Sequence, residues 1–247
     1  YKIRCKIHSI CNNFISFCGW NPGDERELFT LKDLEKEFDL SCVSKSAAVF
    51  NVEKLDWYNK QYMVNMDLDE LAEHALPFFV NAGVVDSGNQ TTPLLLGVGG
   101  GVRYNADTLA AINNQLEYLK KAIALERGRA ATLVELVEST GFLFADELTY
   151  QPELLIWKKS TKEETKQNLT KLNKILEEMP EEEWGQEKLE AKIKSWLEEN
   201  NLATGSVLWP MRVALSGQKN SPGPFEIAEV LGRERTVQRI ERAARIL

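Results

Sequence analysis

The stretch Trp209-Pro-Met-Arg-Val-Ala-Leu-Ser-Gly-Gln-Lys-Asn-Ser-Pro-Gly-Pro-Phe-Glu226 joins an apolar run to a loop rich in glycine, serine and proline. The arginine-rich segment 236–247 follows it and places arginines and apolar side chains on opposite faces of a helix. An apolar run, a glycine loop and a basic amphipathic helix together predict a small helical module that contacts a polyanion.

The residues before this stretch predict long and highly charged helices. Two overlapping capping boxes within residues 160–164 favour a helix start there. Apolar residues at helical spacing then continue to a stop at Pro180 and resume over residues 189–197. Further helix boundaries are predicted at Gly205, at the N-cap and first-turn pair Ser221-Pro222, and at Gly232.

Further upstream, the sequence predicts shorter helices separated by turns. Thr30-Leu-Lys-Asp33 resembles a capping box, Asp67 is a predicted N-cap, and Pro77 is expected to kink or end the helix that Asp67 opens. Residues 83–105 are the least helical part, and Gly97-Val-Gly-Gly-Gly101 within them lacks the spacing of a dinucleotide-binding loop. Helices are predicted within residues 1–18, over 30–38, 52–63, 67–77 and 106–125, and in the following segment up to residue 140.

Composition places few limits on the function of the chain. Its 247 residues suffice for one or two domains, and 43% hydrophobic and 27% charged residues are ordinary for a soluble globular protein. No apolar run reaches the roughly 18 residues that cross a bilayer, and no signal-peptide pattern occurs at the start. The chain also does not begin with Met, so we expect a monomeric fragment of a cytoplasmic protein without membrane contact.

The net charge of −7 hides an uneven distribution. Residues 177–199 contain nine glutamates and three lysines, whereas residues 233–245 contain five arginines and two glutamates. An acidic chain can therefore still present a local basic face to RNA.

Residues typical of metal sites and catalysis are scarce. Cys5, Cys11, Cys18 and Cys42 form no Cys-x-x-Cys pair, so buried reduced thiols are favoured over a cluster of His8 with its neighbouring cysteines. Two histidines provide little material for general acid–base chemistry. The sequence predicts no metal site and no catalytic residue.

Two distant parts of the chain resemble one family. The stretch 209–226 with the helix after it is similar to the C-terminal anticodon-binding part of bacterial glutamyl-tRNA synthetases, whose tail follows the pattern LRVALTG…SPG.FE…LG.ER…RI. Gly19-Trp-Asn-Pro-Gly-Asp-Glu-Arg-Glu27, Val43-Ser-Lys-Ser46 and Lys54-Leu-Asp-Trp57 resemble the stem-contact region of that family. These blocks occur in the order of the family and at roughly its spacing.

The resemblance implies a mainly α fold, with two helical anticodon-binding subdomains after a small mixed helical stem-contact region. Residues 1–66 would form the partial stem-contact region, 67–159 the first subdomain and 160–247 the second. The family joins glutamate to its tRNA with ATP and magnesium, in an N-terminal catalytic domain that this chain does not contain.

Arg127 and Arg129 lie between two predicted helices, in a segment similar to the RER.KTL.EL stretch of the family. The resemblance implies that an arginine here contacts the last anticodon letter, and Arg129 aligns better than Arg127. A guanidinium has five donors and can stack on a base, which suits unpaired RNA bases. The alternative is an ordinary surface arginine.

A second group of predicted tRNA contacts lies near the C-terminal glycine loop. Trp209 could stack on a base or pack in the core, and the arginine face of the last helix could contact RNA or balance the acidic helices. Lys45 lies in a Val-Ser-Lys-Ser segment similar to the lysine loop of class I synthetases, but no His-containing companion motif occurs. We therefore interpret Lys45 as a phosphate or structural contact. The predicted set comprises Lys45, Trp209, Arg212, Lys219, Arg233, Arg235 and Arg239.

The resemblance thus predicts a tRNA-binding, anticodon-recognising part of a glutamate–tRNA ligase. The implied partners are tRNA(Glu), with tRNA(Gln) left open, and the missing N-terminal catalytic domain. No cofactor is expected in this chain, whereas ATP and magnesium are implied for the full-length enzyme. The alternative is a stand-alone helical module that binds nucleic acid or another protein.

Overall fold

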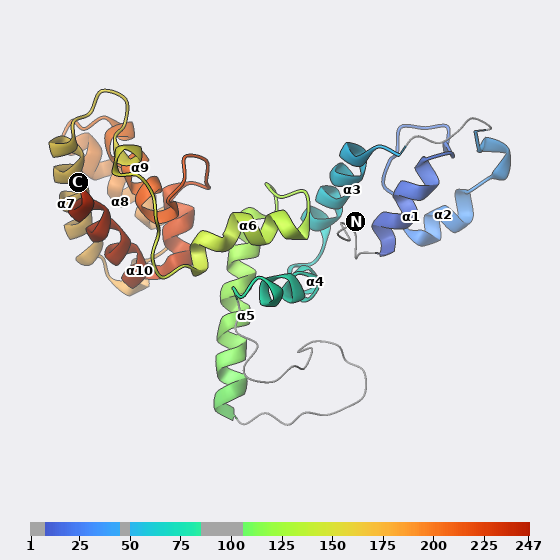
Figure 1. Cartoon of the computed structure of the whole chain (residues 1–247), viewed down its shortest axis with the longest axis horizontal. Coiled ribbons are helices and arrows are strands. Elements are labelled where there is room, and N and C mark those ends of the chain that lie inside the picture. Colours follow the sequence, from blue (N-terminus) through green and yellow to red (C-terminus); the bar gives the residue numbers. More distant parts are fainter. Residues whose placement is uncertain (1–7, 45–49, 85–105) are drawn as a thin grey trace. The chain divides into compact units, whose positions relative to one another are not determined.

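Figure 1 shows the computed structural model of the chain, which describes residues 8–44, 50–84 and 106–247. Helices dominate these residues, and the only β pairing among them is an isolated antiparallel bridge between Trp20 and Val43. The chain divides into two compact units, Tyr1–Ser139 and Thr140–Leu247. The mainly α prediction is confirmed, and the three-part division at residues 66 and 159 stays a prediction.

Side-chain caps set the helix starts of the first unit. The Thr30 hydroxyl accepts from the Asp33 amide, and the Asp33 carboxylate accepts from the Thr30 amide, which is the predicted capping box. The predicted N-cap Asp67 accepts from the amide of Asp69 at 2.9 Å. The helices are α1 His8–Phe17, α2 Leu31–Glu37, the short η1 Leu40–Cys42, α3 Val52–Asn65, α4 Leu68–Asn81, α5 Ala106–Glu126 and α6 Leu133–Phe144, which reaches into the second unit.

Pro77 lies inside α4, which continues for four further residues to Asn81. The prediction that Pro77 could end this helix is therefore wrong. A proline removes one backbone hydrogen bond, but buried side chains on both sides of it, Leu76 and Phe79, hold the last turn against the core. Burial of apolar surface outweighs the local cost.

A polar clip joins three segments of the front region. Asn13 on α1 is buried, and its carbonyl oxygen accepts from the Phe29 amide at 3.0 Å. Its amide nitrogen donates to the Phe29 carbonyl and to the Tyr62 hydroxyl on α3. The clip fixes the chain between two small apolar clusters, one formed by Phe14, Leu55 and Tyr58 and the other by Trp20, Phe29 and Leu34.

The second unit is a helical bundle in which α10 packs against α7, α8 and α9 (Figure 1). Leucines of α7, such as Leu169 and Leu172, are fully buried on the side that faces the bundle. The Thr161 and Glu164 pair forms its predicted capping box at the start of α7. The elements are η2 Pro152–Leu155, α7 Lys162–Glu177, η3 Glu181–Glu183, α8 Gln186–Glu199, α9 Thr204–Ser216 and α10 Pro224–Ile246.

The start of α10 differs from the prediction. Gly223, not Ser221, is the N-cap, and Pro224 occupies the first turn. The Glu226 carboxylate accepts from the Gly223 amide at 2.7 Å. A side chain of the first turn thus satisfies an amide that has no backbone partner at the helix start. Gly232 has φ 77° and interrupts α10 where the sequence predicted a helix end, but the arginine-rich helix begins immediately after it.

Gly205 lets α9 lie against the aromatic ring of Trp157. A Cβ atom added at Gly205 would stand 2.3 Å from Cζ2 of Trp157 and 2.4 Å from its Cε2. Atoms that are not bonded cannot approach so closely, so this position requires the absence of a side chain.

Candidate nucleic-acid interface

The turn between α5 and α6 presents the two arginines that the sequence singled out. Amides of Arg129 and Ala130 both donate to the Glu126 carbonyl, which closes α5 with a tight turn. At the other end, the Ala131 amide donates to the Glu135 carboxylate, and the Glu135 amide donates to the Thr132 hydroxyl. Capping from both sides fixes the conformation of this six-residue turn, 127–132.

The two arginines of this turn have different roles. The side chain of Arg129 is 49% exposed, and its Nε lies 3.3 Å from the carboxylate of the buried Glu126. Arg127 is half-buried and donates to the Met66 carbonyl at 3.4 Å, at the junction of α3 and α4. Arg127 therefore fastens the turn to the first unit, whereas Arg129 is accessible to a ligand.

Trp209, Arg212 and Lys219, three of the four residues predicted to cluster around the C-terminal glycine loop, lie together, and Arg233, the fourth, donates to the Glu177 carbonyl. The Trp209 indole donates to the Leu154 carbonyl at 2.8 Å, and the Arg212 guanidinium lies 4.7 Å from the Trp209 ring centroid. Arg212 in turn donates to the Lys219 carbonyl at 2.7 Å and holds the loop after α9. The side chain of Lys219 is exposed at the tip, so this residue is the one best placed to meet a phosphate.

Arginines of α10 are tied to the protein instead of forming one exposed face. Arg239 is buried, and its guanidinium donates to the carbonyls of Leu215 at 2.6 Å, Phe142 at 2.9 Å and Ala145 at 2.6 Å. The sequence placed Arg239 on the arginine face of the last helix, and these contacts show that its guanidinium points into the bundle. Helical periodicity cannot reveal that carbonyls nearly a hundred residues away in sequence fill the space in front of one position.

The other arginines of α10 also have internal partners. Arg235 donates to the Ala145 carbonyl at 3.2 Å, and Arg233 donates to the Glu177 carbonyl at the end of α7. Arg242 forms an exposed ion pair with Glu147 at 2.6 Å. Hydrogen bonding to that carboxylate raises the pKa of Arg242 and lowers the pKa of Glu147.

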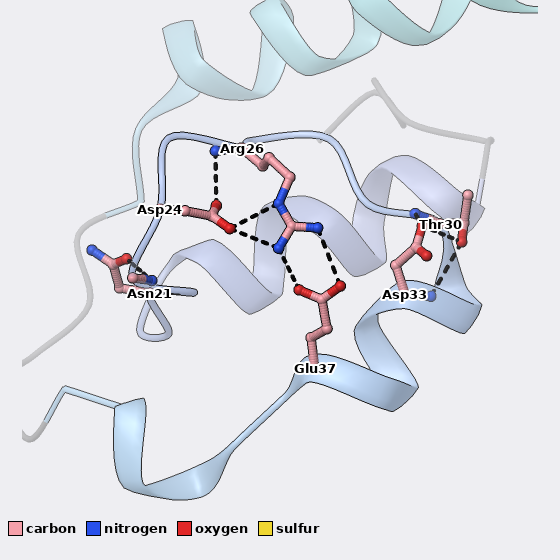
Figure 2. Close-up of polar contacts among 7 residues, drawn as sticks. Asn21, Asp24, Arg26, Thr30, Asp33 and Glu37 are labelled. Atoms are coloured by element: carbon pink, nitrogen blue, oxygen red, sulfur yellow. Dashed lines mark hydrogen bonds and ion pairs between the residues drawn. The ribbon is translucent and has the colours of Figure 1, made fainter.

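In the first unit, the acidic side chains of Asp24 and Glu37 pair with Arg26, as Figure 2 shows. Arg26 forms a bidentate ion pair with Glu37 and also pairs with Asp24 at 2.7 Å. Hydrogen bonds from Arg26 lower the pKa of the Asp24 carboxyl, and those to Glu37 and Asp24 raise the pKa of the guanidinium. Arg26 thus fastens the loop before α2 to that helix. Lys45, a predicted phosphate or structural contact, lies outside the described residues.

The described part of the chain carries neither a metal cluster nor a membrane-spanning helix. Among those residues, no group of three or more His, Cys, Asp and Glu side chains could hold a metal ion. None of the helices described is both long and apolar enough to span a membrane.

Residues 70–244 match the family profile described as "Anticodon binding domain". This match covers more than half of the chain, so the chain belongs to the anticodon-binding domain family.

Curated relatives are glutamate–tRNA ligases. The Flavobacterium psychrophilum protein is 31% identical over 232 residues, which are 94% of this chain and 40% of that protein. The Dehalococcoides mccartyi protein is 35% identical over 243 residues, 98% of this chain and 45% of the relative. The chain therefore spans about two fifths of the length of the relatives it matches. The family resemblance inferred from the sequence blocks is confirmed.

The fold also has a solved counterpart. A crystal structure of a glutamate tRNA ligase from Elizabethkingia meningosepticum superposes with a TM-score of 0.75, over 97% of this chain and 41% of the other. The sequence identity of 23% supports the shared fold and nothing beyond it.

Proposed function

We propose that this chain is the tRNA-handling part of a glutamate–tRNA ligase and that its Arg129 turn contacts the anticodon loop. The observation that carries the proposal is the anticodon-binding family match over residues 70–244, which includes both the turn 127–132 and the loop after α9. The full-length enzyme would join glutamate to tRNA(Glu), and tRNA(Gln) is a second possible substrate. ATP and magnesium would bind the part of the ligase outside this chain.

The geometry of the Arg129 turn suits contact with an unpaired base. Caps on both sides keep the backbone rigid, and Glu126 contacts Arg129 through Nε. A guanidinium positioned in this way can donate to a base edge or stack on its face. Lys219 and the backbone of the loop after α9 would contribute contacts to the ribose–phosphate backbone.

Exposed apolar residues of the front unit support a contact with the remainder of the ligase. Leu40 is 81% exposed and Phe50 is 65% exposed. Single exposed apolar residues are normal, whereas a group of them favours an interaction surface. The exposed set in this region is Ile15, Leu28, Leu31, Phe38, Leu40, Val43, Phe50, Val52, Trp57 and Val64. We propose that the N-terminal catalytic domain of the parent enzyme, a cytoplasmic monomer, covers part of this surface.

Replacing Arg129 with glutamine tests the anticodon contact. Binding of tRNA(Glu) is compared with binding of a variant tRNA that differs only in the last anticodon letter, at one salt concentration. Loss of a specific base contact should reduce the difference in binding free energy between the two tRNAs by about 1–3 kcal/mol. Equal weakening of both tRNAs would mean that Arg129 contacts only the backbone.

Two comparisons complete this experiment. Arg245→Gln changes the charge equally at a site 73% exposed, and it should leave the difference between the two tRNAs unchanged. Duplex DNA at the same salt concentration serves as a competitor. Stronger binding of the duplex than of tRNA would contradict the proposed function and favour a general nucleic-acid-binding module.

The chain alone should neither charge tRNA nor bind ATP. The sequence contains no pair of nucleotide-binding signatures, and the described residues form helices without a parallel sheet to carry one. Calorimetry with ATP and magnesium, together with a charging assay, measures both properties. Saturable ATP binding or any glutamyl-tRNA product would show that catalytic parts reside in this chain.

A further inference from the structure

Charge in the second unit is separated between two helices. Residues 158–174, which comprise the turn before α7 and most of α7, contain six lysines and two glutamates. Residues 177–199, which comprise the end of α7 together with η3 and α8, contain nine glutamates and three lysines. The turn before α7 and most of α7 are therefore basic, although the chain as a whole is acidic.

Three of these lysines form a ridge on the surface of α7. Lys162, Lys166 and Lys174 occupy a row of positions four residues apart, in which Thr170 takes the remaining place. Such rows follow the surface of an α-helix continuously, and this one extends over about 18 Å of helix axis. All four side chains are exposed, because the opposite face of α7 packs into the bundle. We call Lys162, Lys166 and Lys174 the lysine ridge.

The ridge lysines lack acidic partners within the part of the chain that the structure describes. The Glu164 carboxylate, which lies two residues from both Lys162 and Lys166, accepts instead from the Thr161 amide at 2.9 Å. On α8, by contrast, Lys194 pairs with Glu190 at 2.6 Å. Like charges four residues apart on a helix repel each other, so the ridge slightly destabilises α7 in the isolated chain.

The turn before α7 extends this basic surface. Lys158 and Lys159 are exposed, and the Lys158 ammonium lies 4.6 Å from the centroid of the Trp157 ring. The Ser160 amide donates to the Trp157 carbonyl at 2.9 Å, which closes the turn and keeps both lysines next to the start of the helix.

We propose that the lysine ridge contacts successive phosphates of the bound RNA and forms a backbone track on the second unit. The inference rests on the proposed tRNA-binding function and adds a further place of contact on the second unit. Lysine is a strongly hydrated point charge that suits phosphate, and it is depleted in protein–protein interfaces. The row contains no apolar side chain that could anchor a protein partner. Glutamates of α8 would repel the same RNA and so fix the side on which it lies.

The salt dependence of tRNA binding tests the ridge. A triple variant, Lys162→Gln with Lys166→Gln and Lys174→Gln, is compared with unchanged protein by titrating tRNA(Glu) transcript at several salt concentrations. Each phosphate contact contributes about 0.7–0.9 to the slope of log affinity against log salt. The slope should therefore fall in magnitude by about 2–3. The triple substitution to arginine, which preserves charge, should restore the slope of the unchanged protein.

A matched control separates local contact from overall charge. Lys188→Gln with Lys192→Gln and Lys194→Gln removes the same charge from exposed positions of α8, and the slope should change by less than about one contact. Equal changes in the two triple variants, or an unchanged slope in the ridge variant, would overturn the proposal.

Further outcomes distinguish failure of the ridge proposal from failure of the proposed function. If the ridge variant keeps both its anticodon discrimination and the salt slope of the unchanged protein, the lysine ridge proposal is refuted and the proposed function stands. Absence of tRNA binding by the unchanged protein would refute the proposed function as well. Ridge-dependent binding to phosphatidylserine vesicles without tRNA binding would assign the ridge to a membrane surface and would also overturn the RNA proposal.

Discussion

Replacing Arg239 with methionine should lower the free energy of unfolding of the second unit by about 3 kcal/mol. Hydrogen bonds to a charged donor contribute about 1.5–3 kcal/mol each, and they are not additive when they share one group. Methionine fills most of the volume but leaves the Leu215, Phe142 and Ala145 carbonyls without this donor. Denaturant unfolding measures the loss, and hydrogen exchange of amides in α9 and α10 assigns it to this unit.

Arg245→Met is the control for that experiment, because Arg245 lies on the same helix with a side chain 73% exposed and an i,i+4 ion pair to Glu241. Its stability should change by no more than about 0.5 kcal/mol. Arg239→Lys should give an intermediate loss, because one ammonium cannot match the fork of a guanidinium toward three carbonyls. Similar stabilities of Arg239→Met and Arg245→Met would show that the buried guanidinium contributes little.

Gly205→Ala should destabilise the second unit by about 1–3 kcal/mol, although the same change stabilises most helices. An alanine in a helix interior is favoured over glycine by about 1 kcal/mol. Here the added methyl group would stand 2.3 Å from Trp157, so the ring and α9 must move apart, and overpacking of this kind costs more than the helix gains. Thermal unfolding of the two proteins gives the sign directly.

Gly141→Ala provides a control with the opposite expected sign. Gly141 lies inside α6, and nothing stands within 4 Å of the position that its Cβ would take. Alanine there should raise the midpoint temperature. In a Trp157→Leu background, the cost of Gly205→Ala should become smaller because the rigid ring is gone. An unchanged cost in that background would refute the steric explanation.

Helix positions could be predicted from the sequence where one local signal was sufficient. Thr30 with Asp33 and Thr161 with Glu164 form their capping boxes as predicted, because these contacts depend on a spacing of three residues and little else. Pro77 and Ser221 gave wrong boundaries. At Pro77 tertiary packing continues the helix, and before α10 the hydrogen bond from the Gly223 amide to the Glu226 carboxylate selects a later start.

Candidate site residues were predictable as neighbours only where the sequence separation was short. Trp209, Arg212 and Lys219 meet because one turn of helix and one loop bring them together. The environment of Arg129 depends on Glu126, three residues away, and the pair could have been recognised by its i,i+3 spacing. Nothing local indicates that Arg239 is buried, because its partners lie 24 to 97 residues away. The lysine ridge had a compositional signal, the six lysines of residues 158–174.

Arginines of the last helix act as shared caps for the C-terminal ends of its neighbours. Carbonyls at the end of a helix lack partners and carry a partial negative charge, which a cation can satisfy. Arg233 does this at Glu177 for α7, and Arg239 does it for α6 and α9 through carbonyls at both helix ends. Much of the positive charge of this helix is thus bound to carbonyl groups within the bundle. Three of its arginines, Arg233, Arg235 and Arg239, serve the ends of α6, α7 and α9, so the number of arginines on such a helix overstates the charge that it can offer to RNA.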